Sequence, residues 1–149
     1  MMHYYSLFTL SITFTGFIIG LGAVTVIDIH GFLGRKSPYW TQATIRTHKV
    51  TKPLIWLGMI LAVIGSVGYY WTDGMTLLHM LQLIIALILI INGCFLSFWL
   101  SPRLLERERL GKDQELLPSA WQQATTISFI ISVIGWWTEV LLLCWHILV

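Results

Sequence analysis

The segment Met75–Leu100 reads MTLLHMLQLIIALILIINGCFLSFWL and contains no charged side chain in 26 residues. A helix needs about 20 mostly apolar residues to cross the hydrocarbon core of a bilayer. Three further segments are long and apolar enough, and they cover residues 6–29, 53–71 and 124–149. The sequence therefore predicts an all-α integral membrane protein whose residues 1–149 form a single transmembrane domain with four spans.

The composition supports a chain that is surrounded by lipid. Hydrophobic residues make up 56% of the chain and charged residues only 11%, whereas soluble domains carry about 25% charged residues. Cys94 and Cys144 lie inside apolar runs without CxxC spacing, which is typical of packing residues rather than of a redox or zinc motif. The expected surrounding is the lipid bilayer, with no nucleic acid as a partner.

The basic residues are confined to two of the links between spans. All nine Lys and Arg residues fall in residues 30–52 or 101–123, and neither the N-terminal residues nor the short Thr72–Gly74 link holds one. Because cytoplasmic loops attract Lys and Arg, these two segments are predicted to be cytoplasmic loops. We therefore expect a four-helix up-down-up-down bundle in the cell (inner) membrane, N-out and C-out, with both termini non-cytoplasmic.

Small and polar residues recur every three or four positions along each span. Gly16 and Gly20 form such a pair in the first span, and Gly58 and Ala62 form another in the second. Helices in lipid associate through close packing and hydrogen bonds, so small residues favour the helix faces that meet. The simplest interpretation is that these stripes hold the bundle together.

Ionisable residues inside the spans need a different explanation, because a charged group in hydrocarbon costs several kcal/mol. Glu139 lies in the outer half of the fourth span, and His146 follows seven residues later on the same helix face. The third span begins at the outer side, which places His79 and Gln82 at a similar depth. These four side chains are predicted to converge, with Glu139 and Gln82 as a proton or ion site.

The same layer offers ligands for copper. Met80 and His3 also belong to the outer ends of the spans, together with His79 and His146. Thioether and imidazole groups are ligands that suit copper. The alternative is that the methionines fill gaps and that the interfacial histidines meet water.

Two histidines from neighbouring helices can also hold a b-type haem in a four-helix bundle. His79 with His146 would form the outer pair of axial ligands. His30 with His48, at the cytoplasmic ends of the first two spans, would form an inner pair. The sequence leaves haem b and copper open as cofactors.

Asp28 lies just inside the cytoplasmic boundary of the first span, close in sequence to Arg35 and Lys36. An ion pair that closes the inner face is the simpler interpretation. The functional alternative is an inner proton-exchange site, with Asp28 and His30 as carriers.

The start of the second span, THKVTKPLIWLGM, places His48 about two helical turns before Trp56 and Gly58. This arrangement resembles helices of the copper-resistance D-type membrane proteins and related haem-binding four-helix membrane proteins. The resemblance covers one helix start, and it implies copper or haem binding as an expectation.

Three functions remain open. The first is electron transfer or metal handling with haem b or copper, and the second is a non-enzymatic accessory subunit of a larger membrane complex or homo-oligomer. The third is a small proton-coupled carrier that uses Glu139 and Asp28. No segment has the pattern of a catalytic motif, so no catalytic residue is assigned and an enzyme is not expected.

Overall fold

The structure, a computed structural model, describes residues 2–71 and 76–148, with side chains from residue 4 onward. Its elements are the helices α1 (Met2–Gly34), α2 (Pro38–Tyr70) and α3 (Leu77–Cys94), the π-helical turn η1 (Phe95–Leu100), and the helices α4 (Ser101–Arg109) and α5 (Ser119–Leu148). The described residues contain no strand. The all-α prediction is confirmed.

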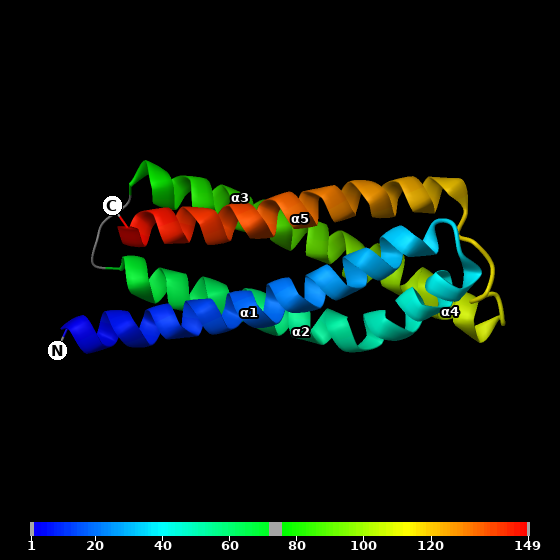
Figure 1. The fold of residues 1–149 in the computed structure, drawn as a ribbon, viewed down its shortest axis with the longest axis horizontal. Coiled ribbons are helices and arrows are strands. Elements are labelled where there is room, and N and C mark those ends of the chain that lie inside the picture. The colour runs from blue at the N-terminus through cyan, green and yellow to red at the C-terminus, as the bar shows by residue number, and fades with distance from the viewer. Residues whose placement is uncertain (1, 72–75, 149) are drawn as a thin grey trace.

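Four continuous helical stretches are long and apolar enough to cross a membrane, because α3, η1 and α4 together form one stretch, Leu77–Arg109. Each of the other three corresponds to one of the predicted spans. Figure 1 shows the stretches lying side by side, with both chain ends at one end of the bundle and α4 at the other. The coarse prediction of a multi-pass membrane protein is therefore supported.

The helices extend well beyond the predicted spans. Residues 30–52 were expected to form a loop, but only residues 35–37 of that segment are non-helical, and in the expected loop 101–123 only residues 110–118 are. A 33-residue helix is about 50 Å long, whereas the hydrocarbon core measures about 30 Å. The apolar stretches therefore do not mark where the helices end, because the backbone stays helical beyond them.

Two prolines illustrate how local chemistry shapes these helices. Pro38 opens α2, where its missing N–H is tolerated. Pro102 follows η1, and the Ser101 N–H donates a hydrogen bond to the Leu96 carbonyl, five residues back. Because proline removes the next donor and its ring needs space, we attribute the wider π-helical turn to Pro102.

Helices α1 and α2 meet along the predicted small-residue stripes. A Cβ atom added to Gly16 would collide with the backbone of Ala62 and Gly58, and one added to Gly58 would collide with the backbone of Gly20. No side chain separates the two helices at these points. We call this contact the α1–α2 seam, and it confirms the packing role predicted for both residue pairs.

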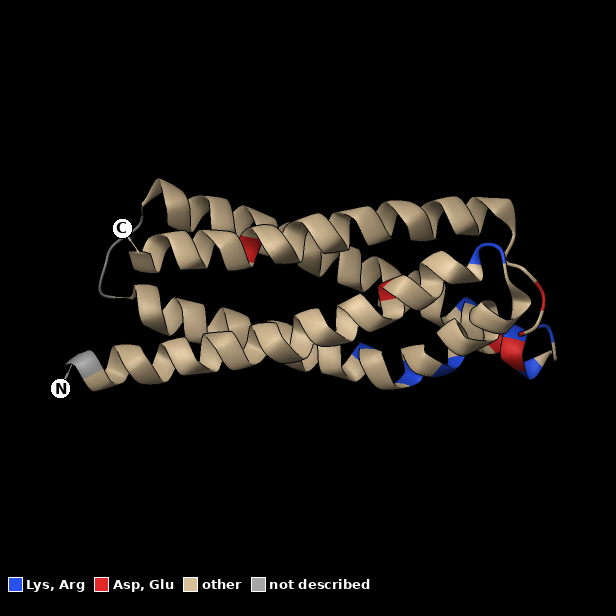
Figure 2. Cartoon of the chain, viewed as in Figure 1, with Lys and Arg blue, Asp and Glu red and all other residues tan. Residues whose placement is uncertain are grey.

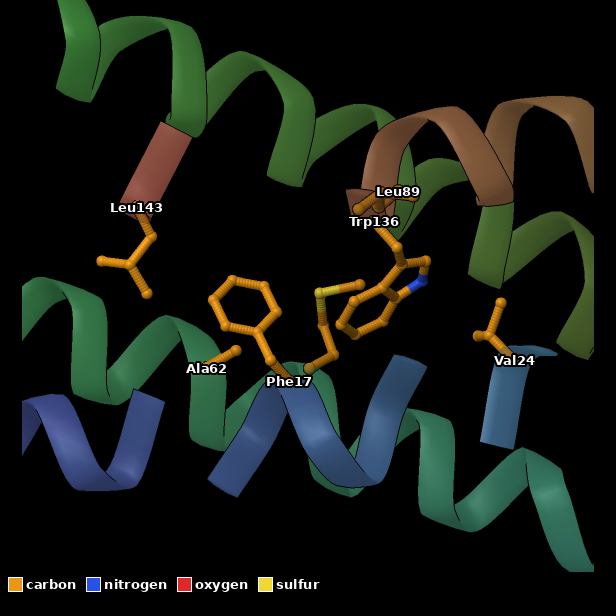
Figure 3. Close-up of a cluster of buried hydrophobic side chains, with 7 residues drawn as sticks. Phe17, Val24, Ala62, Leu89, Trp136 and Leu143 are labelled. Carbon is orange, nitrogen blue, oxygen red and sulfur yellow. The ribbon is translucent and has the colours of Figure 1, made fainter. Parts of the chain in front are cut away.

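Helix α5 packs against α3 and also contacts α1. The Asn92 amide donates to the Ser128 carbonyl at 3.2 Å, and the Ser128 hydroxyl donates back to the Asn92 side-chain oxygen at 2.7 Å. On the other side, the Trp136 indole lies over Gly20 of α1. Figure 3 shows Trp136 and Phe17 pointing toward one another inside the apolar core.

The charged residues are distributed unevenly along the bundle. Figure 2 shows Lys and Arg only in the half that ends in α4. Lys49 of α2 pairs with Glu108 of α4 at 2.7 Å, and Gln42 donates to Asp113 in the following link. The end with α4 is therefore held by polar contacts between α2 and the segment that follows the third span.

Candidate functional site

A cavity of about 380 Å³ lies between α2 and α3, with α1 and α5 forming its inner wall. Small-molecule sites commonly measure about 300–1,000 Å³, so this cavity is large enough for an organic ligand. We call it the outer cavity. Its lining residues are Phe17, Met59, Ala62, Val63, Ser66, Val67, Tyr70, Trp71, His79, Gln82, Leu83, Ala86, Leu89, Trp136 and Glu139.

Three polar side chains of this lining are deeply buried. His79, Gln82 and Glu139 expose 6%, 7% and 7% of their surface. His79, Gln82 and Ala86 follow one another at helical spacing, so they share one face of α3, and Glu139 contacts the backbone of Ala86 from α5. The third and fifth helices therefore present one polar patch to a mostly apolar cavity.

Two oxygen atoms of this patch have no hydrogen-bond partner among the described residues. They are Oε1 of Gln82 and Oε1 of Glu139, and both are buried. Buried polar atoms are almost always hydrogen-bonded in native proteins, and leaving one unpaired costs about 1–3 kcal/mol. Both atoms can accept a hydrogen bond from a group inside the cavity.

The histidines of this layer are in direct contact with each other. The ring centroids of His79 and His146 are 5.0 Å apart, and the Tyr70 ring lies 4.0 Å from His79 and 4.8 Å from His146. His79 also caps α3, because its Nδ1 accepts from the Thr76 N–H at 3.3 Å. The structure thus brings together the four predicted residues, with His146 behind His79 rather than in the cavity lining.

The described geometry gives no support to the copper and haem sites predicted in this layer, which stay predictions. Within the described residues, no group of three or more His, Cys, Asp or Glu side chains is placed to hold a metal ion. The rings of His79 and His146 lie against each other, which leaves no space between them for a porphyrin. Met80 is half exposed and lies outside the cavity lining, and the side chain of His3 lies outside the described residues.

A second, smaller cavity of about 80 Å³ lies near the end with α4, and we call it the inner cavity. Asp28 of α1 and His48 of α2 line it, and Asp28 Oδ2 and His48 Nε2 are buried atoms without a hydrogen-bond partner in the described part of the chain. Asp28 interacts with the hydroxyl of Ser132 on α5. The volume of the inner cavity suits water molecules or a small ion rather than an organic ligand.

The expected ion pair between Asp28 and the nearby basic residues is not formed among the described residues. Arg35 instead donates to the Thr126 hydroxyl at 3.2 Å and lies over the Phe32 ring. The reason is geometric: Asp28 faces Ser132 inside the bundle, while Arg35 is two helical turns farther along α1. Asp28 is therefore a half-buried carboxyl group with a hydroxyl partner rather than one half of a salt bridge.

The inner histidines are not brought together. His30 is within hydrogen-bond distance of the Thr47 hydroxyl, at 3.1 Å, and its ring packs on Trp40 at 5.2 Å. His48 lines the inner cavity, and His30 does not. The described geometry thus gives no support to a pair of axial ligands at this end.

An apolar layer separates the two cavities. This layer consists of four buried residues of one core cluster, which also line the end of the outer cavity nearer the inner cavity. They are Phe17, Met59, Leu89 and Trp136. Ser132, the partner of Asp28, precedes Glu139 by seven residues, which is about 10 Å along α5. The carboxyl groups of Asp28 and Glu139 therefore lie about two helical turns apart in depth.

Sequence reasoning missed the part of the site that α2 contributes. Ser66 and Tyr70 line the outer cavity from α2, whereas the sequence pointed to a site between the third and fourth spans. The spacing of Met59, Val63, Ser66 and Tyr70 on one helix face was the only available signal, and it does not say which helix lies opposite.

The three residues that carry the resemblance to copper- and haem-binding membrane proteins lie in two different parts of the structure. His48 and Trp56 line the inner cavity, and Gly58 belongs to the α1–α2 seam. No protein-family model, curated protein or solved structure matches this chain.

Proposed function

We propose that this protein is a small proton-coupled carrier of the cell (inner) membrane. Glu139 in the outer cavity and Asp28 in the inner cavity act as its two exchange stations. The observation that carries the proposal is Glu139 itself, a buried carboxyl group that lines a ligand-sized cavity and has an unpartnered oxygen. A carboxyl group placed inside a membrane bundle is by default a functional group.

The proposed orientation places both termini outside and the helix α4 in the cytoplasm. The nine basic residues support it, because all of them lie in the half of the bundle near α4 and cytoplasmic segments attract Lys and Arg. The chain then crosses the membrane in an up-down-up-down order. In this orientation Glu139 serves the outer side and Asp28 the inner side.

The two stations are suited to exchange on opposite sides. Each carboxyl group lines its own cavity, and the apolar layer of Phe17, Met59, Leu89 and Trp136 separates them. Water and ions cross such a layer poorly, so protons pass only when the layer rearranges. A permanently open channel would need a continuous polar path, which these side chains interrupt.

A hydrophobic carbodiimide tests the outer station, because this reagent adds to protonated carboxyl groups in apolar surroundings and leaves a stable N-acylurea. We expect Glu139 to be labelled in the purified protein and labelling to fall as the pH rises, because the ionised group does not react. Mass spectrometry of peptides locates the label. His79 and Tyr70 face Glu139 across the cavity, so His79→Gln serves as a control for titration of that imidazole.

The Asp28→Asn variant keeps Glu139 labelling and serves as the matched control, while Glu139→Gln removes it. Thermal unfolding in detergent checks that both variants are folded. Glu139 that stays unlabelled at every pH, or labelling that is independent of pH, would contradict the proposal. It would favour an accessory-subunit role, in which Glu139 only supports packing.

A further inference from the structure

We infer that the outer cavity binds a hydrophobic ammonium ion, which enters from the lipid between α2 and α3. This inference rests on the proposed function and names the class of solute that the carrier takes. Three features of the outer cavity support it: an opening toward the lipid, the sign of its unpartnered atoms, and its volume.

The opening lies along the side of the bundle. Val63, Val67 and Leu83 line the cavity and still expose 36%, 54% and 51% of their surface. Val63 and Val67 belong to α2 and Leu83 to α3, and these helices pack mainly against α1 and α5 respectively. A solute dissolved in the bilayer can therefore reach the cavity without crossing the headgroup region.

The charged and polar groups around the outer cavity favour a cation over an anion. The unpartnered atoms of the polar patch, Oε1 of Glu139 and Oε1 of Gln82, are both hydrogen-bond acceptors. All nine basic residues of the chain lie between Arg35 and Lys52 or between Arg103 and Lys112, and none of them lines the outer cavity. An ammonium group donates up to three hydrogen bonds and pairs with a carboxylate, whereas an anion would be repelled by the ionised Glu139.

The volume of the outer cavity and its aromatic wall favour a cation that carries an apolar organic group. About 380 Å³ is within the range of small-molecule sites. The aromatic rings of Phe17 and Trp136 form the wall opposite the opening, and aromatic faces attract organic cations. The inner cavity, at about 80 Å³, is too small for the same molecule. The solute is therefore recognised in the outer cavity.

Binding of the cation is coupled to release of a proton. The protonated Glu139 gives up its proton to solvent, and the resulting carboxylate pairs with the ammonium group, so one positive charge replaces another. The titratable groups that face Glu139 are His79 of α3 and Tyr70 of α2, with His146 of α5 behind them; Phe17, the lining residue from α1, does not titrate. Affinity should rise about tenfold per pH unit wherever Glu139 is protonated in the free protein.

Three probes with one apolar body test the charge selection, and they are 4-phenylbutylammonium, 4-phenylbutanol and 4-phenylbutyrate. Calorimetry on the purified protein should show that the ammonium ion binds at least about tenfold more tightly than the alcohol, because charge-assisted hydrogen bonds are stronger than neutral ones. The carboxylate should bind most weakly. Equal affinities, a preference for the carboxylate, or no binding of the ammonium ion would overturn the inference.

Two adjacent residues of α2 test the lateral opening. Val63 lines the cavity, while Ile64 faces outward at 60% exposure and does not line it. Val63→Trp should slow association of 4-phenylbutylammonium several-fold, measured by its protection of Glu139 from the carbodiimide, and Ile64→Trp should behave like the wild type. Identical protection rates in the two variants would rule out this route.

The solute class and the proton station at Glu139 are contradicted by different results. If Glu139 is labelled with the expected pH dependence but 4-phenylbutylammonium neither binds nor protects, the solute class is wrong and the proton station stands. If Glu139 is never labelled, the carrier itself is wrong, whatever the probes do.

Discussion

The two faces of α2 differ in how closely they approach the neighbouring helices. Gly58 and Gly65 bring one face into backbone contact with α1, while Met59, Val63 and Ser66 leave a cavity of about 380 Å³ before α3. One helix therefore belongs both to a closely packed pair and to the wall of the outer cavity. The bundle is thus held together on one face of α2, and a cavity remains on the other.

The largest expected effect comes from breaking the α1–α2 seam. Gly16→Ala adds a methyl group where the backbone of Ala62 and Gly58 already lies, so the helices must separate. Overpacking of this kind costs about 1–3 kcal/mol. Unfolding in mixed micelles should show that loss.

Gly22→Ala is the matched control on the same helix, because a Cβ there would have no neighbour within 4 Å. It should be neutral or slightly stabilising, since alanine favours a helix more than glycine does. Equal losses for the two variants would mean that the seam is not a tight contact.

A smaller effect is expected from the contact between α3 and α5. The reciprocal hydrogen bonds between Asn92 and Ser128 hold these helices together beside the inner cavity, which Ser128 lines. A double-mutant cycle with Asn92→Ala and Ser128→Ala should give a coupling energy of about 0.5–2 kcal/mol. Additive effects of the two substitutions would contradict this pairing.

Filling the outer cavity should raise stability and weaken ligand binding. Ser66→Leu places apolar atoms in the outer cavity, and cavity filling changes stability by about 1 kcal/mol, usually favourably. The same variant should lose binding of 4-phenylbutylammonium. A variant that binds the probe normally would show that the cavity is not where the probe sits.

The smallest effect concerns the polar contacts near α4. Lys49 and Glu108 form an ion pair whose side chains are 48% and 28% exposed, and pairs of this kind contribute about 0.2–1 kcal/mol. Glu108→Gln should lower stability by that amount at low salt and by less at high salt. A salt-independent loss above this range would mean that the pair is more buried than described.

Much of the fold could be predicted from the sequence, because it depends on local patterns. The four apolar stretches and the small-residue faces of Gly16, Gly20 and Gly58 are properties of single helices. The shared depth of Gln82 and Glu139 also follows from helix length alone. These predictions needed no knowledge of how the helices are arranged.

The features that could not be predicted from the sequence depend on contacts between helices. The sequence does not reveal that Tyr70 packs on His79, that Asp28 meets Ser132 rather than Arg35, or that the cavity opens between α2 and α3. It also hides the helical continuation of residues 30–34 and 38–52, because hydropathy detects lipid contact and not hydrogen bonding along a backbone. These features arise from which faces meet and how closely.

Transport in proteoliposomes tests the carrier most directly. The probe is labelled 4-phenylbutylguanidinium, which stays charged at neutral pH and therefore does not cross lipid as a neutral base, and which still donates hydrogen bonds. An outward proton gradient should drive its accumulation in vesicles with the wild-type protein. Glu139→Gln should abolish this uptake and Asp28→Asn should slow it strongly. Uptake no faster than in protein-free vesicles, or unchanged in Glu139→Gln, would contradict the account.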